Sequence, residues 1–183
     1  MTVGTRYTMV PDIIDALINM FRGEALAAAA ALPPDANGTP AVLEVIDGEA
    51  TTELPAAYVM VGYNAAFASS GFSGSTGLAV EGGRVQTEVG NRQFAEAFTV
   101  WCEASTYSGD SDPAALSRQR HATGALISVL FAALEADPTL QNLVTAPTYA
   151  EVTTFRWLLD RSSDGVAATV QFGVGIGQLW VPR

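Results

Sequence analysis

The feature that most constrains this chain is an alternating pattern of apolar residues within an uncharged stretch, from Gly165 to Pro182. A period of two places alternate side chains on one face of a strand. The apolar positions of that face are Val166, Ala168, Val170, Phe172, Val174 and Ile176. An earlier run alternates in the same way, with Thr153, Phe155, Trp157 and Leu159 on one face. Residues 161–165 between the runs are typical of a turn, so the two runs predict an antiparallel hairpin.

Two other segments have helical periodicity. The first extends from Pro11, which suits the first position of a helix, to Leu32, which is followed by two prolines. Its apolar stripe consists of Ile13, Ile14, Leu17, Ile18 and Phe21. The second begins at Asp112 and Pro113, an N-cap residue followed by a proline, and ends at Asp137. Its buried stripe consists of Leu126, Val129, Leu130, Ala133 and Leu134.

Four more strands are predicted, over residues 42–46, 58–63, 85–89 and 93–105. In the last of them, Phe98, Val100 and Cys102 share one face, so we expect the Cys102 side chain in the core. The order of helix, strands, helix and hairpin predicts an α+β fold: a mainly antiparallel sheet with two main helices packed on one face and a C-terminal β-hairpin. The length of 183 residues suits a single domain over residues 1–183.

Residues 64–83 are dominated by alanine, serine and glycine, and they include Phe67 and Phe72. A segment of this length without periodicity is uncommon in an ordered domain unless it has a purpose. One interpretation is a Gly/Ser-rich arm that contacts a partner through its two aromatic residues. The other is a weak hairpin folded on the domain, and the sequence does not separate the two.

The charge balance excludes several classes of function. The chain has 19 acidic and 9 basic residues, for a net charge of -10, and all the basic residues are arginine. Without lysine, neither a Walker-type phosphate loop nor a Schiff-base mechanism is available. A protein this acidic repels DNA and anionic membranes on balance, so we expect no specific DNA binding and no membrane partner.

Single cysteine and histidine residues narrow the chemistry further. Cys102 has no cysteine with which to form an intramolecular disulfide, which fits a reducing compartment. His121 is the only histidine, so a metal site would lack nitrogen ligands and a catalytic triad would have a single possible base. Asp110 and Asp112 precede the second helix and are best explained as capping residues. We therefore expect no enzyme, metal or cofactor.

Neither a leader nor a membrane span is expected. Asp12 and Asp15 interrupt the stretch in which a signal peptide needs its apolar region. The uncharged run from Leu54 to Val80 is rich in serine and glycine, which predicts a strand running into a loop. The run from Gly173 to Gly177 has the glycines of a nucleotide-binding loop but no helix after it, so we interpret it as strand.

The second helix carries an electropositive spot in this acidic chain. Its charges between Ala114 and Leu134 are Arg118 and Arg120, beside His121. One explanation is an intramolecular pair with Asp110 or Asp112. The alternative is a contact between subunits, because a ring needs complementary flanks that face each other.

Taken together, the order of these segments resembles the tail terminator proteins of long, non-contractile-tailed bacteriophages (siphophages). The resemblance covers nearly the whole chain and depends on order and spacing. The segments that carry it are Val10-Pro11-Asp12, the strand ending at Asp47-Gly48, Tyr58–Tyr63, Phe98–Cys102, Ser108-Gly109-Asp110, the helix with Arg118 and Arg120, Asp137-Pro138-Thr139-Leu140 and the final hairpin.

The resemblance implies a structural protein of the virion, located in the tail–neck region and assembled in the bacterial cytoplasm. It implies a homo-hexameric ring that ends the tail tube and joins it to a head-side neck or stopper protein, with DNA passing through the ring. Residues that we expect at subunit or partner interfaces are Phe67, Phe72, Arg118, Arg120 and Trp180. Acidic residues that we expect to face the channel are Glu44, Glu49, Glu53, Glu81 and Glu88.

Three other functions remain open at this point. A neck or tail-completion protein and a tail tube subunit share a small α+β build and ring symmetry with a terminator. A small hydrolase or ligand-binding domain is a remote alternative, which would depend on Asp110, Asp112 and His121.

Overall fold

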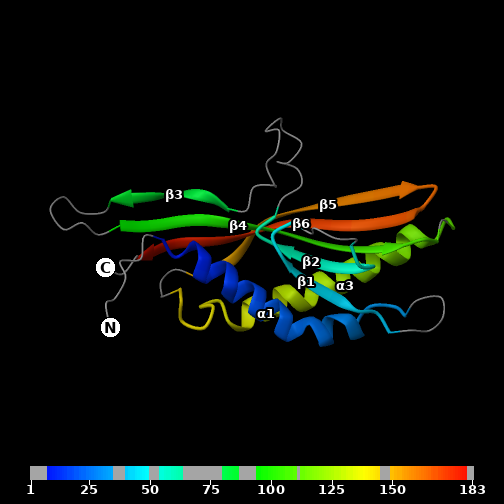
Figure 1. Ribbon diagram of the computed structural model, residues 1–183, viewed down its shortest axis with the longest axis horizontal. Coiled ribbons are helices and arrows are strands. Elements are labelled where there is room, and N and C mark those ends of the chain that lie inside the picture. Colours follow the sequence, from blue (N-terminus) through cyan, green and yellow to red (C-terminus); the bar gives the residue numbers. More distant parts are fainter. Residues whose placement is uncertain are drawn as a thin grey trace.

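In the described part of the chain, two helices lie on one side of a six-stranded sheet (Figure 1). The structure is a computed structural model that describes residues 8–34, 40–49, 54–63, 80–86, 94–110, 112–144 and 149–180. Its elements are α1 (Val10–Ala30), β1 (Leu43–Asp47), β2 (Ala57–Val61), β3 (Val80–Gln86), β4 (Phe94–Ser108), α3 (Ala115–Ala136), β5 (Ala150–Ser162) and β6 (Gly165–Trp180). The predicted α+β class, the helices on one face and the C-terminal hairpin are confirmed.

The long strand β4 organises the sheet. The strand order is β1-β2-β4-β6-β5, and β3 pairs with β4 beside this path. Strand β2 pairs with residues 102–106 of β4 and β3 with residues 94–100, so the two share one edge of β4 end to end. Only the β1–β2 pair is parallel among the described strands. Strands β1 and β5 are therefore the outer strands of the five-strand path.

The helix-side core is built in rows that cross the sheet from β1 to β5. One row runs through Val45, Val59, Ala104, Val170 and Trp157. A second runs through Asp47, Val61, Cys102, Phe172 and Phe155. A third runs through Leu43, Ala57, Thr106, Ala168 and Leu159. The alternation that the sequence predicted for Val166–Ile176 is confirmed, because all six apolar side chains are buried.

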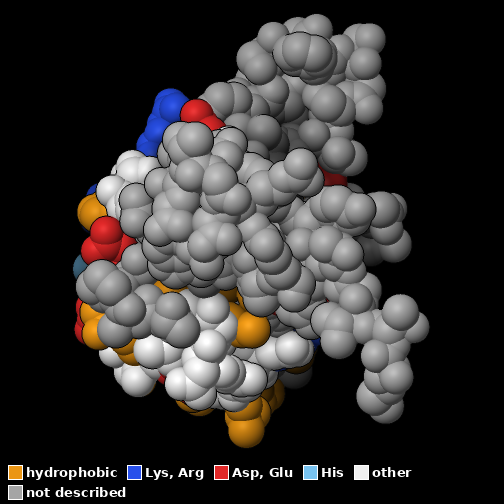
Figure 2. Space-filling model, turned by 90° about the vertical axis from the view of Figure 1, so that its left-hand side faces the viewer, with side chains coloured by type: hydrophobic (Ala, Val, Ile, Leu, Met, Phe, Trp, Pro, Cys, Tyr) orange, Lys and Arg blue, Asp and Glu red, His pale blue; other side chains and the backbone are white. Residues whose placement is uncertain are grey.

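Helices α1 and α3 cover these rows from below in Figure 1. The ring of Phe172 meets Phe21 of α1 at 6.3 Å and Phe131 of α3 at 5.4 Å between centroids, both edge to face. Such pairs stabilise a core beyond the area that they bury. Seen from the left-hand end of Figure 1, hydrophobic side chains reach the surface mainly low on the molecule, on this helix side (Figure 2).

The N-terminus of α1 is held by a carboxylate from the sheet. Glu96 of β4 accepts hydrogen bonds at Oε2 from the Met9 backbone N–H, at 2.9 Å, and from the Thr8 hydroxyl, at 3.0 Å. The Glu96 side chain is buried. A negative charge at this end satisfies an N–H group that lacks an intrahelical partner and complements the helix dipole.

The helix-free face of the sheet holds a buried polar cluster. Glu103 of β4 accepts a hydrogen bond from the Tyr58 hydroxyl at 3.1 Å and another from the Gln171 amide at 2.9 Å. All three side chains are buried. Burial, and then the charge of Glu103, raise the pKa of Tyr58 to about 12.

Several sequence predictions need correction. Thr153 does not share a face with Phe155: the register shifts between Val152 and Thr154, and the Thr153 hydroxyl donates to the Gly173 carbonyl at 3.2 Å, on the helix-free side. A Cβ at Gly175 would collide with the Thr153 side chain, so the glycines of this strand make room for the bulge. Strand β3 begins at Val80, which places the last four residues of the predicted arm in the sheet.

The second helix begins at Ala115, two residues after the proline predicted to open it. Asp112 still caps the turn, because its Oδ1 accepts hydrogen bonds from the backbone N–H groups of Ala114 and Ala115. The first helix ends at Ala30, two residues before the predicted end.

Candidate subunit interface

The outer strand β5 exposes side chains of core type. Phe155, Trp157 and Leu159 are 60%, 38% and 45% exposed, although each ends a helix-side row whose inner members are buried. The strand pairs only with β6 among the described strands, so its other edge presents unpaired backbone groups. Proteins normally protect such an edge, and an apolar one is a site of association.

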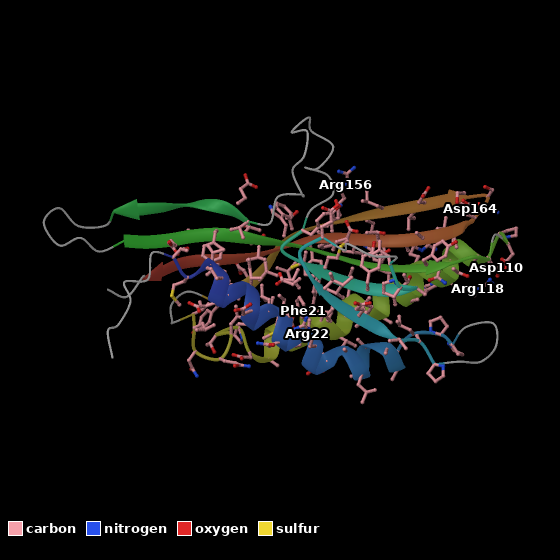
Figure 3. All side chains as sticks on the ribbon, in the orientation of Figure 1. Phe21, Arg22, Asp110, Arg118, Arg156 and Asp164 are labelled. Carbon is pink, nitrogen blue, oxygen red and sulfur yellow. The ribbon has the colours of Figure 1, made fainter. Side chains whose placement is uncertain are left out.

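Helix α3 covers the β5 edge only in part. The Trp157 ring lies 3.9 Å from the position that a Cβ would take on Gly124 of α3. Arg120 precedes Gly124 by four residues, which places it on the same helix face, toward β5. The edge therefore combines apolar side chains with the exposed Arg120. On the helix-free face of β5 it also carries the exposed Arg156, which is labelled in Figure 3.

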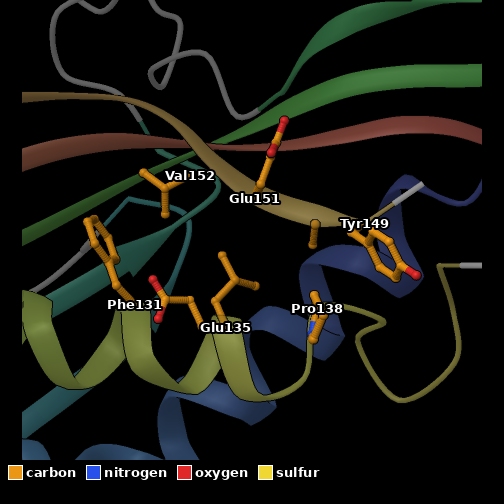
Figure 4. A pocket seen from close by; sticks show the side chains of 8 residues that line it. Phe131, Glu135, Pro138, Tyr149, Glu151 and Val152 are labelled. Carbon is orange, nitrogen blue, oxygen red and sulfur yellow. The ribbon is translucent and has the colours of Figure 1, made fainter. Parts of the chain in front are cut away.

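A groove continues the same edge toward the start of β5 (Figure 4). It has a volume of about 430 Å³ and lies between the C-terminal end of α3 and the beginning of β5. Phe131, Leu134, Pro138 and Val152 form apolar walls, and Glu135 and Glu151 are the charged residues of the lining. The two carboxylates therefore lie near the first residues of β5, and Arg156 lies farther along the strand.

The opposite outer strand, β1, presents a different surface. Three acidic residues, Glu44, Asp47 and Glu49, are exposed on β1 or directly after it. Arg22 of α1 donates from Nη2 to the Val45 carbonyl at 3.3 Å, which fixes α1 beside this strand. Leu26, one turn after Arg22 on α1, is 85% exposed.

The predicted interface residue Arg118 is engaged within the chain. Its Nη2 group lies 2.6 Å from Oδ2 of Asp112 and also contacts Asp110 (Figure 3). The Arg118 hydrogen bond holds the pKa of Asp112 down at about 2. The cluster borders a second cavity of about 760 Å³, between the C-terminal end of α1 and the start of α3.

Of the acidic residues expected to face a channel, Glu44 and Glu81 lie on the helix-free face. Glu44 is the register partner of Tyr58, and Glu81 is the register partner of Thr99. Both are exposed, as is Glu49 just after β1. Phe67, Phe72, Glu53 and Glu88 lie outside the described residues. Trp180 is the last residue of β6, and the structure describes its backbone but not its side chain.

Sequence reasoning missed the β5 edge as a candidate interface. Phe155, Trp157 and Leu159 were recognised as one face of a strand, but an alternating pattern does not reveal whether that strand is central or outermost. The charges at 151, 156, 160 and 161 within a single strand were the available signal, because natural proteins place charges on edge strands.

Within the described residues, no group of three or more His, Cys, Asp or Glu side chains is placed to hold a metal ion. Nor is any described helix long and apolar enough to cross a membrane. His121 is exposed on α3, and Cys102 is fully buried in the core.

Comparisons with known proteins identify no family. No protein-family model matches the chain, and no curated protein sequence matches it. Among solved structures, the chain is similar to one from the "Virion of native gene transfer agent (GTA) particle". That similarity covers 94% of this chain and 99% of the other, with 13% sequence identity and a TM-score of 0.49.

Proposed function

We propose that this protein is a structural component of a phage-like virion, in which it forms a ring that terminates the tail tube and joins it to the head. The observation that carries the proposal is the outer strand β5, whose core-type residues Phe155, Trp157 and Leu159 are exposed. A surface of this kind needs a protein partner rather than a small substrate. The family resemblance of the sequence supplies the virion context.

The two outer strands support a ring. Strands β1 and β5 end the same sheet but differ in sequence and charge, so copies that meet through them make a heterologous contact. Such a contact closes into a ring when the rotation between copies closes. The helix-free face, with Glu44 and Glu81 exposed, then supplies a negative wall that DNA can pass without binding.

The test is a stop codon early in this gene, with the resulting particles viewed by negative-stain microscopy. A terminator predicts headless tails of uneven, excessive length, because nothing stops tube growth. Tails of normal length beside DNA-filled heads would contradict tube termination and assign the protein to the joining step. A matched control restores the protein from a plasmid and should restore tail length.

The same two edges also favour a second candidate, a tail tube subunit. A heterologous contact that does not close generates an open filament instead of a ring. The purified protein separates the two functions: a tube subunit polymerises into long fibres at raised concentration, whereas a terminator stops at one ring.

A further inference from the structure

Strands β1 and β5, the outer strands of the five-strand path, end the same helix-side rows with different side chains. Each row starts on β1 and ends on β5: Leu43 with Leu159, Val45 with Trp157, and Asp47 with Phe155. Leu43 and Val45 are buried under α1, whereas their counterparts on β5 are exposed beside α3. Two of the three rows therefore end in buried apolar side chains at the β1 edge and the third ends at the exposed Asp47, whereas all three end in exposed apolar side chains at the β5 edge.

The β1 edge has exposed apolar side chains that could cover those of β5. Leu26 of α1 and Val42, directly before β1, are 85% and 74% exposed. Leu26 lies in the helix layer, and the side chains of Phe155, Trp157 and Leu159 lie on the face of the sheet that this layer covers. If the sheets of two copies align edge to edge, the helix layers align too, and the apolar side chains of both edges meet on one side.

The charges of the two edges are also complementary. The β1 edge has Glu44, Asp47 and Glu49 against the single Arg22. On the β5 edge, Arg156 lies on the helix-free face, since it is the register partner of Gln171, and Glu44 lies on the same face of β1. Arg120 adds a positive charge from α3.

Acidic residues on β5 do not cancel this match. Glu151 lies at the start of the strand, beside the groove and outside residues 153–157, which the five residues of an antiparallel β1 face when Glu44 lies opposite Arg156. Asp160 lies within the contact region, where Arg156 and Arg120 outnumber it.

We infer that the β1 edge of a second copy of this chain docks on the β5 edge, with Glu44 facing Arg156 and the partner's Leu26 and Val42 covering Phe155, Trp157 and Leu159. This inference rests on the proposed ring and names its subunit contact. Pairing like edges is disfavoured, because two β1 edges would oppose carboxylates and two β5 edges would oppose arginines.

The test uses cysteine pairs and a short bis-maleimide cross-linker. Val42→Cys marks the β1 edge and Asp160→Cys marks the β5 edge, and both positions are exposed, so neither change disturbs the core. The native Cys102 is fully buried and does not compete for the reagent. Each variant alone should remain uncross-linked, and an equal mixture should give a dimer and nothing larger. A chain with both cysteines should give a ladder that stops at the ring size.

A charge exchange adds specificity. Arg156→Glu in the Asp160→Cys chain should lower the dimer yield at least about fivefold, since opposed like charges at an interface are destabilising. Glu44→Arg in the Val42→Cys partner should restore the yield. As the matched control, Glu81→Arg changes the charge of an exposed residue on β3, away from the β5 edge, and should leave the yield unchanged.

Two outcomes would overturn the inference. One is a dimer formed by the Asp160→Cys chain alone, which would mean that like β5 edges pair. The other is the absence of a mixed dimer both in solution and in assembled particles. The cross-linking result and the tail length of the stop-codon mutant are independent. A mixed dimer together with normal-length tails would support the contact and contradict the terminator function. Overlong tails without a mixed dimer would support the terminator function and contradict the contact.

Discussion

At the residue scale, two buried groups make stability sensitive to alkaline pH. Burial raises the pKa of the Cys102 thiol from 9.0 to about 12, and burial with the Glu103 charge raises that of Tyr58 from 10.0 to about 12. Both groups stay protonated in the folded protein, whereas the unfolded chain loses these protons first. Their contribution is therefore complete below pH 9 and is lost as the pH rises to 12.

We expect the free energy of unfolding, measured by urea denaturation, to fall between pH 9 and 11.5, with a slope of at most about 1.4 kcal/mol per pH unit for each group. The absence of lysine keeps this window free of ammonium titration. Cys102→Ala should remove the part of the slope that begins near pH 9, and Tyr58→Phe the part that begins near pH 10. A slope unchanged in both variants would contradict the assignment, whatever their stability at pH 7.

At the scale of elements, Glu96 of β4 couples the sheet to the start of α1. Glu96→Ala removes the acceptor for the Met9 N–H and the Thr8 hydroxyl, and it should lower the free energy of unfolding by about 2 kcal/mol. Glu96→Gln keeps an acceptor without the charge and should lose about half as much. Urea unfolding at pH 7 measures both. Glu151→Ala, at an exposed position, is the control, and an equal loss there would contradict the coupling.

Elements were predictable where one strong period decided them. The face of Val166–Ile176 and the helices with Phe21 and Leu126 follow from spacing alone, because burial on one side leaves a regular pattern. The β-bulge at Thr153 and strand β3 could not be predicted in this way. A bulge inserts one residue without changing composition, and β3 contains Gly82 and Gly83, which weaken a strand signal.

The candidate site was less predictable than the fold. Arg118 and Arg120 have the same charge and lie two residues apart in one helix, on different faces, yet Arg118 is held by Asp110 and Asp112 while Arg120 lies on the face toward β5. Which of the two arginines forms an intramolecular ion pair depends on the geometry of the turn before α3. Whether Trp157 is core or surface depends on strand order, a property of the whole sheet.

At the scale of the whole molecule, the proposed function predicts that the charge of the helix-free face affects DNA passage. Glu81 and Glu44 project from this face on strands that lie on the same side of β4, because β3 and β2, to which β1 is paired, share one edge of β4. Glu44 also lies at the inferred contact between copies, so Glu81 tests the channel without disturbing that contact. If the helix-free face lines the ring, Glu81→Arg places a ring of arginines against the DNA phosphates, which attract DNA and exchange counterions with it.

We expect virions with Glu81→Arg to assemble normally and to eject DNA about tenfold more slowly at low ionic strength, recovering as salt rises. Time-resolved ejection in a receptor-triggered assay measures this. Glu81→Gln removes the charge without reversing it and should eject close to the wild-type rate, because no phosphate binding is created. Glu135→Arg, on the helix side, reverses a charge of the same sign away from the channel, so ejection slowed equally by both arginines would place the helix-free face elsewhere than the lumen.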